Sequence, residues 1–368
     1  MVVSASYSNA MFCILPIMNR LAGRKTPLPN SAHSLFCVIM ALLFFTCTSN
    51  VQSRVWIENG RLSTSAGAYF IKGVCYHPVN IGETTRTFDS LTSDLALMKE
   101  MGVNTIRVYE PIVSESILDE IHAAGIKVIV GFGYNQGGVF DLQSGTYLDY
   151  VRAYKNHPAV LVWELGNEYN YHPEWFEGDI EVWYRILRTG CEAIHALDPN
   201  HPVATAHGEV PSAALIQELA EIDLWGLNVY RWDESHTALR DFSERSEKPV
   251  YFSELGADSY MTESNLGYAQ GENQRAQADA TRNMLENILT DSTRAAGVTL
   301  FSFTDGWWKA GNAGQQDMGG WAPGSSGVPY DATANEEYWG LVNMHREKKE
   351  AFWIVKSHFE SFELTPGH

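Results

Sequence analysis

Apolar residues along the chain follow two different periods, one typical of buried strands and the other of helices. Short runs of consecutive apolar residues, such as residues 159–163 and 249–252, have the length and composition of fully buried strands. The segments between them place apolar residues three or four positions apart, as in residues 91–101, which indicates a helix with one buried face. The two patterns alternate from residue 70 to residue 359.

This alternation predicts an α/β fold, a (β/α)8 TIM barrel, because strands that alternate with helices pair in parallel and eight such units close on themselves. The predicted strands cover residues 70–76, 104–109, 126–132, 159–163, 203–206, 223–230, 249–254 and 298–303. The predicted helices cover residues 91–101, 114–124, 146–155, 180–197, 212–220, 237–244, 273–289 and 349–359.

A β-hairpin is predicted before the first of these units. Asn59 and Gly60 form a tight-turn dipeptide between apolar residues, and we expect the hairpin to cover the bottom of the barrel. No linker, repeat or low-complexity tract divides residues 54–368, which are therefore expected to form a single domain. The glycine-rich residues 311–327 are expected to form a long loop after the last strand, at the end of the barrel that carries the site.

Residues 1–53 have the pattern of a signal or leader segment. Arg20, Arg24 and Lys25 precede an apolar run at residues 35–45, which is short for a membrane span and typical of the apolar core of a signal peptide. Small and polar residues follow, and cleavage is expected near Ser49 or Ser53. The pattern predicts a secreted or periplasmic protein, with an uncleaved signal anchor or a lipid anchor as the alternative.

The charge and the cysteines exclude several kinds of partner. The net charge of −18 repels nucleic acid and anionic membranes, so no nucleic acid and no membrane beyond an anchor is expected. Outside the leader, Cys75 and Cys191 are expected to be buried free thiols or a single bridge, and no zinc spacing occurs. No metal and no cofactor is expected, and the sequence does not indicate an oligomeric state.

Polar and aromatic residues follow every predicted strand. In a (β/α)8 barrel the carboxyl ends of the strands form the active face, so these side chains are candidates for one site. Glu168 and Glu254 are the leading candidates because each follows a strongly apolar strand, whereas Glu164 is expected to be buried and paired. The remaining candidates are His77, Arg107, Tyr109, Asn167, His207, Asn228, Tyr230, Trp307 and Trp308.

Several of these residues also have an ordinary structural explanation. Arg107 could form a structural ion pair, His77 could be a histidine of the core, and at least one of Trp307 and Trp308 is expected to pack under the long loop. Most of the 17 tyrosines and 11 tryptophans are expected to fill the core.

The motifs at these strand ends resemble a known group of enzymes. Asn167-Glu168 and Glu254 are similar to the signature of the retaining glycoside hydrolases of clan A. Residues 226–230 and 248–256 resemble matching segments of several families in that clan. Residues 70–74 and 102–109 are similar to the fungal β-1,3-glucanosyltransferases and to the catalytic barrel of the β-galactosidase/β-glucuronidase family. The resemblance covers residues 54–308, and the loop at residues 311–338 departs from it.

The resemblance implies a retaining glycoside hydrolase or transglycosylase that acts on β-linked glycans by double displacement. Glu168 would be the acid/base and Glu254 the nucleophile, with their carboxyl groups about 5–5.5 Å apart. Arg107 and Tyr230 would keep Glu254 ionised, and Asn167 would bind the 2-hydroxyl of the sugar. Either Trp307 or Trp308 would form the floor of the site for the sugar that is cleaved.

The expected partner is therefore an oligosaccharide or polysaccharide, with β-glucan, and β-1,3 linkages in particular, favoured. A hydrolase of the β-galactosidase, β-glucuronidase or β-mannanase type is the nearest alternative. A catalytically inactive carbohydrate-binding barrel is an alternative from another class, against which the two carboxylates argue. A Schiff-base aldolase would need a lysine at a strand end, and none is convincingly placed there.

Overall fold

The computed structural model of the chain describes residues 54–135, 139–292, 294–318, 321–323, 330–331 and 333–364. The predicted leader at residues 1–53, with its cleavage and anchoring, lies outside these residues, as do parts of the glycine-rich loop. Within the part of the chain that is described, no helix is both long and apolar enough to cross a membrane.

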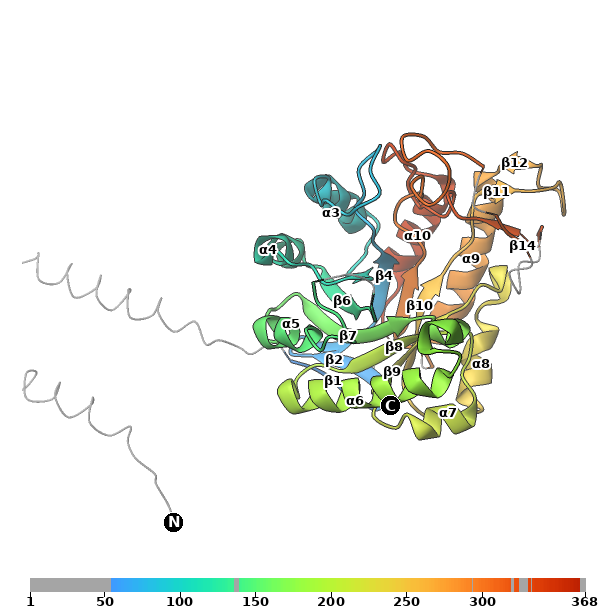
Figure 1. The fold of residues 1–368 in the computed structure, drawn as a ribbon. Coiled ribbons are helices and arrows are strands. Elements are labelled where there is room, and N and C mark those ends of the chain that lie inside the picture. The colour runs from blue at the N-terminus through green and yellow to red at the C-terminus, as the bar shows by residue number, and fades with distance from the viewer. Residues whose placement is uncertain are drawn as a thin grey trace, which may run out of the picture. The chain divides into compact units, whose positions relative to one another are not determined.

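Eight parallel strands form a closed barrel, which confirms the predicted TIM-barrel fold (Figure 1). In chain order they are β4 (Ile71–Cys75), β5 (Thr105–Val108), β6 (Lys127–Phe132), β7 (Val160–Asn167), β8 (Val203–Gly208), β9 (Leu224–Asn228), β10 (Val250–Leu255) and β13 (Gly297–Leu300). Strand β13 pairs with both β10 and β4 and so closes the ring.

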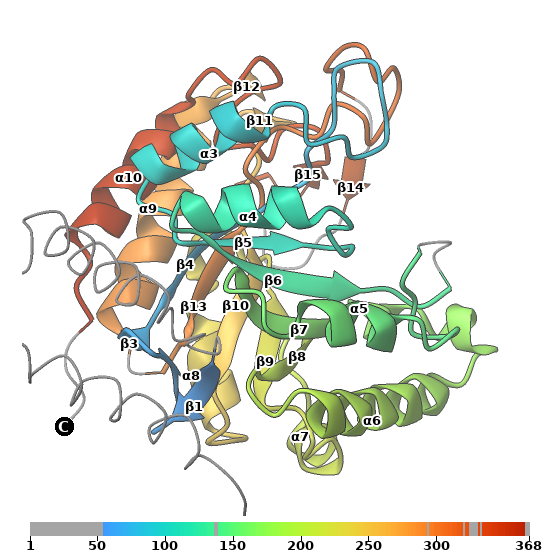
Figure 2. The same cartoon turned by 90° about the vertical axis from the view of Figure 1, so that its left-hand side faces the viewer.

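Helices surround the strands, as Figures 1 and 2 show. They are α3 (Leu91–Glu100), α4 (Glu115–Ala123), α5 (Tyr147–Tyr154), α6 (Ile180–Leu197), α7 (Ala213–Glu218), α8 (Thr237–Ser243), α9 (Gln274–Thr290) and α10 (Glu350–Ser361). Each helix follows one barrel strand, and the bounds agree with the predicted segments within a few residues. The sequence pattern located these elements well because each strand is apolar on both faces and each helix on one.

A three-stranded sheet covers the end of the barrel where the strands begin. It consists of β1 (Val55–Glu58), β2 (Arg61–Thr64) and β3 (Gly67–Tyr69). Asn59 and Gly60 both have positive φ angles, as the predicted tight turn requires. Val55 and Leu62 pack with residues inside the barrel such as Leu161 and Tyr251. The predicted hairpin is confirmed, with β3 as an additional strand that the sequence pattern did not indicate.

Some features of the fold differ from the expectation. Strand β7 continues to Asn167 and includes Glu164, where the prediction ended the strand at residue 163. Glu164 fits inside the barrel because Arg107 and Tyr251 hydrogen-bond to its carboxylate. The loops after β10 and β13 form two further hairpins, β11 (Tyr260–Met261) with β12 (Gly271–Glu272) and β14 (Trp321–Pro323) with β15 (Thr333–Asn335). Cys75 and Cys191 are buried and free.

Candidate active site

Two strand ends bring the leading candidate carboxylates to one cavity. Glu254 lies near the end of β10, and Glu168 directly follows β7. Glu168 has a φ of 57°, a left-handed conformation that turns the chain from the strand into a short 3-10 helix, η1 (Tyr169–Tyr171). Both carboxylates line a cavity of about 340 Å³. The barrel therefore places two acidic groups from distant parts of the sequence around the same space.

Hydrogen-bond donors surround Glu254. Arg107 Nη1 and the Tyr109 hydroxyl donate to Oε1, at 2.9 and 2.6 Å. The Tyr230 hydroxyl donates to Oε2 at 2.5 Å. Glu254 is only 5% exposed, and a carboxylate so far removed from water needs such partners to offset its lost hydration. One cation and two phenols thus fix the carboxylate in place.

Arg107 connects Glu254 to the interior of the barrel. Its guanidinium is fully buried and also pairs with Glu164, with Nη2 2.6 Å from Glu164 Oε1. Burial lowers the pKa of Arg107, but the neighbouring negative charges, that of Glu164 first, raise it well above its usual value. The structural ion pair that was the alternative explanation for Arg107 therefore exists, and the same arginine also binds the candidate nucleophile.

A chain of amides orients Asn167. Its side-chain oxygen accepts from Arg107 Nη2 at 2.8 Å and from Asn228 Nδ2 at 3.0 Å. Asn228 is held in turn by the Ser253 hydroxyl, which donates to Asn228 Oδ1 at 2.7 Å. Because its oxygen accepts from two donors, the amide of Asn167 is fixed where it lines the cavity. Asn228 is not among the described lining residues and supports Asn167 from behind.

Glu168 has an environment unlike that of Glu254. Burial, followed by the negative charge of Glu254, raises the pKa of Glu168 to about 7. A hydrogen bond from Asn228 and the charge of Arg107 oppose this increase. Glu168 consequently keeps a proton to near-neutral pH, next to a second carboxylate held by three donors. Two carboxyl groups in contrasting environments are the arrangement that acid/base and nucleophilic roles require.

Other expected residues lie in or beside this cavity. His77 and Tyr109 both line it, with their rings stacked 4.3 Å apart. Burial lowers the pKa of His77 to about 3, so the imidazole is neutral at ordinary pH. Trp308 lies 6.1 Å from the His77 ring and lines an adjoining cavity of about 460 Å³.

The structure does not bring His207 and Trp307 to the lining of the carboxylate cavity. His207 Nδ1 lies 2.9 Å from the backbone oxygen of Glu209. Trp307 is fully buried and packs against Trp308, with the Arg346 guanidinium 5.6 Å from its ring. His207 lies within β8, with its ring 6.1 Å from that of Trp225. Trp307 lies in the loop after β13, where sequence position does not define the direction of the side chain.

Sequence reasoning missed the opposite wall of the cavity. The residues of this wall come from the segment between β13 and α10. They are Phe301, Lys309, Ala334, Glu336 and Trp339. The Trp339 ring lies 5.0 Å from Tyr230 and 5.6 Å from Phe301. The available signal was the Tyr338-Trp339-Gly340 run, an aromatic pair before a glycine in a loop that follows the last strand.

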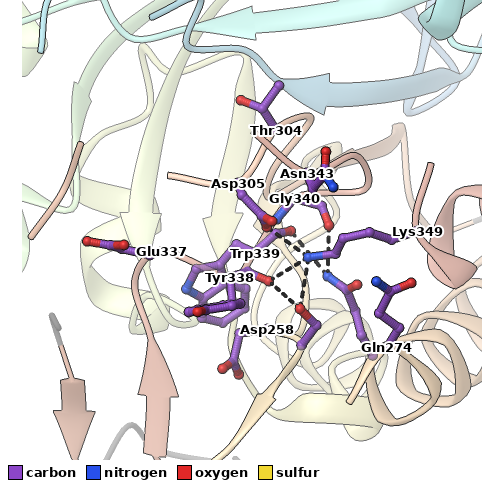
Figure 3. Close-up of polar contacts among 12 residues, drawn as sticks. Asp258, Gln274, Thr304, Asp305, Glu337, Tyr338, Trp339, Gly340, Asn343 and Lys349 are labelled. Carbon is purple, nitrogen blue, oxygen red and sulfur yellow. Dashed lines mark hydrogen bonds and ion pairs between the residues drawn. The ribbon is translucent and has the colours of Figure 1, made fainter. Parts of the chain in front are cut away.

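A buried ion pair holds this wall, as Figure 3 shows. Lys349 Nζ donates to Asp305 Oδ1 and to Ser259 Oγ, both at 2.8 Å, and to the Tyr338 oxygen at 3.1 Å. The Gly340 nitrogen donates to the same Asp305 oxygen at 2.7 Å. The residues on both sides of Trp339 are therefore fixed by one buried lysine and its carboxylate.

The part of the chain that the structure describes contains no group of three or more histidine, cysteine or acidic residues able to hold a metal ion. The site is instead built from two carboxyl groups, their hydrogen-bond donors and aromatic walls at the carboxyl ends of barrel strands. Fold and site together fit the class of (β/α)8-barrel glycoside hydrolases.

Comparisons with known proteins point to the same class. No protein-family model matches the chain. A protein of Aspergillus fumigatus named 1,3-beta-glucanosyltransferase gel2 is 28% identical over 280 residues, covering 64% of this chain and 58% of that protein. A beta-glucuronidase of Chlorocebus aethiops is 25% identical over 293 residues, covering 71% of this chain and 42% of that protein. The chain thus spans less than two thirds of the length of these relatives.

A solved structure supports the fold. A GH2 beta-galacturonidase from Eisenbergiella tayi bound to galacturonate superposes with a TM-score of 0.63 at 20% identity, covering 84% of this chain and 55% of that protein. Together with the curated relatives, it confirms the resemblance to glycoside hydrolases of clan A that the sequence motifs indicated.

Proposed function

We propose that the chain is a retaining glycoside hydrolase or transglycosylase that acts on β-linked glycans by double displacement. The observation that carries this proposal is the pair Glu168 and Glu254, which line one cavity in contrasting environments. A raised pKa suits a proton donor, and a carboxylate fixed by three donors suits a nucleophile.

In the first step, Glu254 attacks the anomeric carbon while Glu168 gives its proton to the glycosidic oxygen, so the leaving group departs and a glycosyl ester forms. In the second step, Glu168 takes a proton from water or from a sugar hydroxyl, whose oxygen attacks the anomeric carbon and releases Glu254. The Arg107, Tyr109 and Tyr230 donors are placed to stabilise the returning charge. The fixed amide of Asn167 is suited to bind the 2-hydroxyl, a contact that strengthens in the transition state.

The charges around the cavity favour a neutral sugar over a uronic acid. Glu168, Glu254 and Glu336 are the acidic residues among the described lining. The one cation in that described set, Lys309, lies 3.0 Å from Glu336 and is already paired. A uronate carboxylate would meet net negative charge here. This supports a β-glucan rather than a β-glucuronide, and the similarity to a 1,3-beta-glucanosyltransferase favours β-1,3 linkages.

We also propose that residues 54–368 are one catalytic domain and that residues 1–53 direct export. The basic residues before an apolar run support the export signal. Expression of the full chain in a secreting host, followed by N-terminal sequencing of the released protein, would test this. A product that retains the apolar run at residues 35–45 would contradict cleavage.

A substrate panel and a trapping experiment test the activity. The wild type should hydrolyse laminarin and 4-nitrophenyl β-glucoside faster than 4-nitrophenyl β-glucuronide, since the cavity offers no unpaired cation among its described lining residues. Incubation with 2,4-dinitrophenyl 2-deoxy-2-fluoro-β-glucoside should attach one sugar to the peptide that contains Glu254. Turnover by Glu254→Ala at the wild-type rate, or labelling elsewhere, would contradict the assignment. Binding of laminarin by the wild type without any turnover would favour the inactive carbohydrate-binding barrel.

A further inference from the structure

A second cavity adjoins the carboxylate cavity on the side of Glu168. Its volume is about 160 Å³, and it shares Tyr109, Asn167 and Glu168 with the first cavity. Glu254 is absent from the residues described as lining it, while His172 and Trp175 are present. The two cavities therefore meet at the candidate acid/base and not at the candidate nucleophile.

This asymmetry assigns a role to the second cavity. In the proposed reaction the nucleophile contacts the anomeric carbon, whereas the acid/base contacts the oxygen that joins this carbon to the leaving group. Of the two candidate carboxyl groups, only that of Glu168 is among the described lining of the second cavity, which favours the leaving-group side. The same space receives the incoming water or sugar hydroxyl in the second step, because the acceptor approaches along the path by which the leaving group departs.

The wall of this cavity carries a preorganised aromatic pair. The rings of His172 and Trp175 stack 4.0 Å apart at an interplanar angle of 7°. His172 Nδ1 lies 2.8 Å from Glu174 Oε1, and the Trp175 ring packs edge-on against Tyr169, with the centroids 5.2 Å apart. Trp175 is nevertheless 47% exposed. An indole held from two sides but open to solvent can stack on the apolar face of a sugar ring at little cost in side-chain entropy.

We propose that His172 and Trp175 bind a sugar unit on the leaving-group side, and that this unit is the acceptor whose hydroxyl competes with water for the glycosyl-enzyme. The inference rests on the proposed function. In the transfer step, the acceptor oxygen bonds to the anomeric carbon and gives its proton to Glu168. The ester bond to Glu254 breaks, and its electron pair returns to that carboxylate.

The test measures how the glycosyl-enzyme divides between water and a sugar. 4-Nitrophenyl β-glucoside serves as donor and laminaritriose as acceptor, with nitrophenol, free glucose and the transfer product quantified together. Trp175→Ala should lower the ratio of transfer to hydrolysis about threefold to tenfold and raise the acceptor concentration needed for half-maximal transfer. The rate of nitrophenol release without acceptor is recorded separately and does not decide the test, because the nitrophenyl group departs on the same side of Glu168 as Trp175. Trp175→Phe should restore most of the transfer.

Trp353→Ala is the matched control. Trp353 is 50% exposed, much like Trp175, but lies on the outer helix α10. This variant should transfer as the wild type does. A wild-type ratio and acceptor dependence in Trp175→Ala would overturn the acceptor site while leaving the proposed glycosidase intact. Full activity in Glu254→Ala, or no turnover of either laminarin or 4-nitrophenyl β-glucoside by the wild type, would instead overturn the proposed function and the acceptor site with it.

Discussion

The two walls of the carboxylate cavity are built in different ways. The wall formed by the strands carries Tyr109, Glu168 and Glu254, which hydrogen-bond to, or lie beside, the Arg107 network inside the barrel. The opposite wall carries Trp339, which comes from a long loop and is fixed by Lys349 and Asp305. In the proposed reaction the barrel would supply the reacting groups, and the loop would supply a surface for the sugar. Changes to the first wall should affect kcat, and changes to the second should affect KM.

Loss of Glu254 should have the largest effect. Glu254→Gln removes the nucleophile but keeps the size of the side chain, so kcat on 4-nitrophenyl β-glucoside should fall roughly 10⁴-fold or more. Thermal unfolding serves as the control for folding. If kcat fell less than about tenfold and KM rose instead, the expectation that the strand wall affects kcat and the loop wall KM would be wrong.

Loss of Glu168 should depend on the leaving group. With a poor leaving group, Glu168→Ala should lower kcat about 10²–10⁴-fold, and added azide should rescue turnover of an activated aryl glycoside. Because burial raises the pKa of Glu168 to about 7, the protonated form that the first step needs is lost as pH rises through that value. The wild-type rate on poor leaving groups should therefore fall above about pH 7, and the variant should lack this decline. An unchanged pH profile would contradict the assignment.

The buried pair on the loop side should matter for stability and KM. Lys349→Met leaves Asp305 buried without its cation, and the free energy of unfolding should fall by about 3–5 kcal/mol. Asp305→Asn combined with Lys349→Met should recover part of that loss. Among folded variants, KM should rise more than kcat falls, because the residues beside Trp339 lose their anchor. A fall in kcat with an unchanged KM would indicate that the pair acts on the carboxylates.

Removal of the aromatic wall should have the smallest effect. Trp339→Ala should raise KM for 4-nitrophenyl β-glucoside about threefold to tenfold with kcat nearly kept, since one ring face is lost while the carboxylates stay in place. Trp307→Ala, a change at a fully buried tryptophan outside the described lining, should mainly lower stability. An equal effect of both variants on KM would contradict a specific role for Trp339.

The same difference between the two walls explains what the sequence could predict. Strand ends are tied to sequence position, because a buried apolar run stops where polar residues can reach the face of the barrel. The meeting of Glu168 and Glu254 at one cavity could therefore be predicted from local pattern and from resemblance together. Trp339 lies 34 residues after Asp305. Long-range contacts bring it to the cavity: Lys349 and Asp305 bind its two neighbours, and the Ser302 nitrogen donates to its backbone oxygen. His207, within β8, and Trp307, in the loop after β13, illustrate the opposite error, because a position near a strand end does not determine that the side chain points to the cavity.

The sheet that covers the beginning of the barrel strands has a practical consequence. The first described residue, Arg54, leads into β1, and Val55 is packed into the end of the barrel opposite the carboxylate cavity. A solid support attached ahead of Arg54 would thus leave the cleft facing outward toward an incoming polymer. Immobilisation through that end should preserve access for long glucans, whereas attachment through the loops after β7 or β13 should block it.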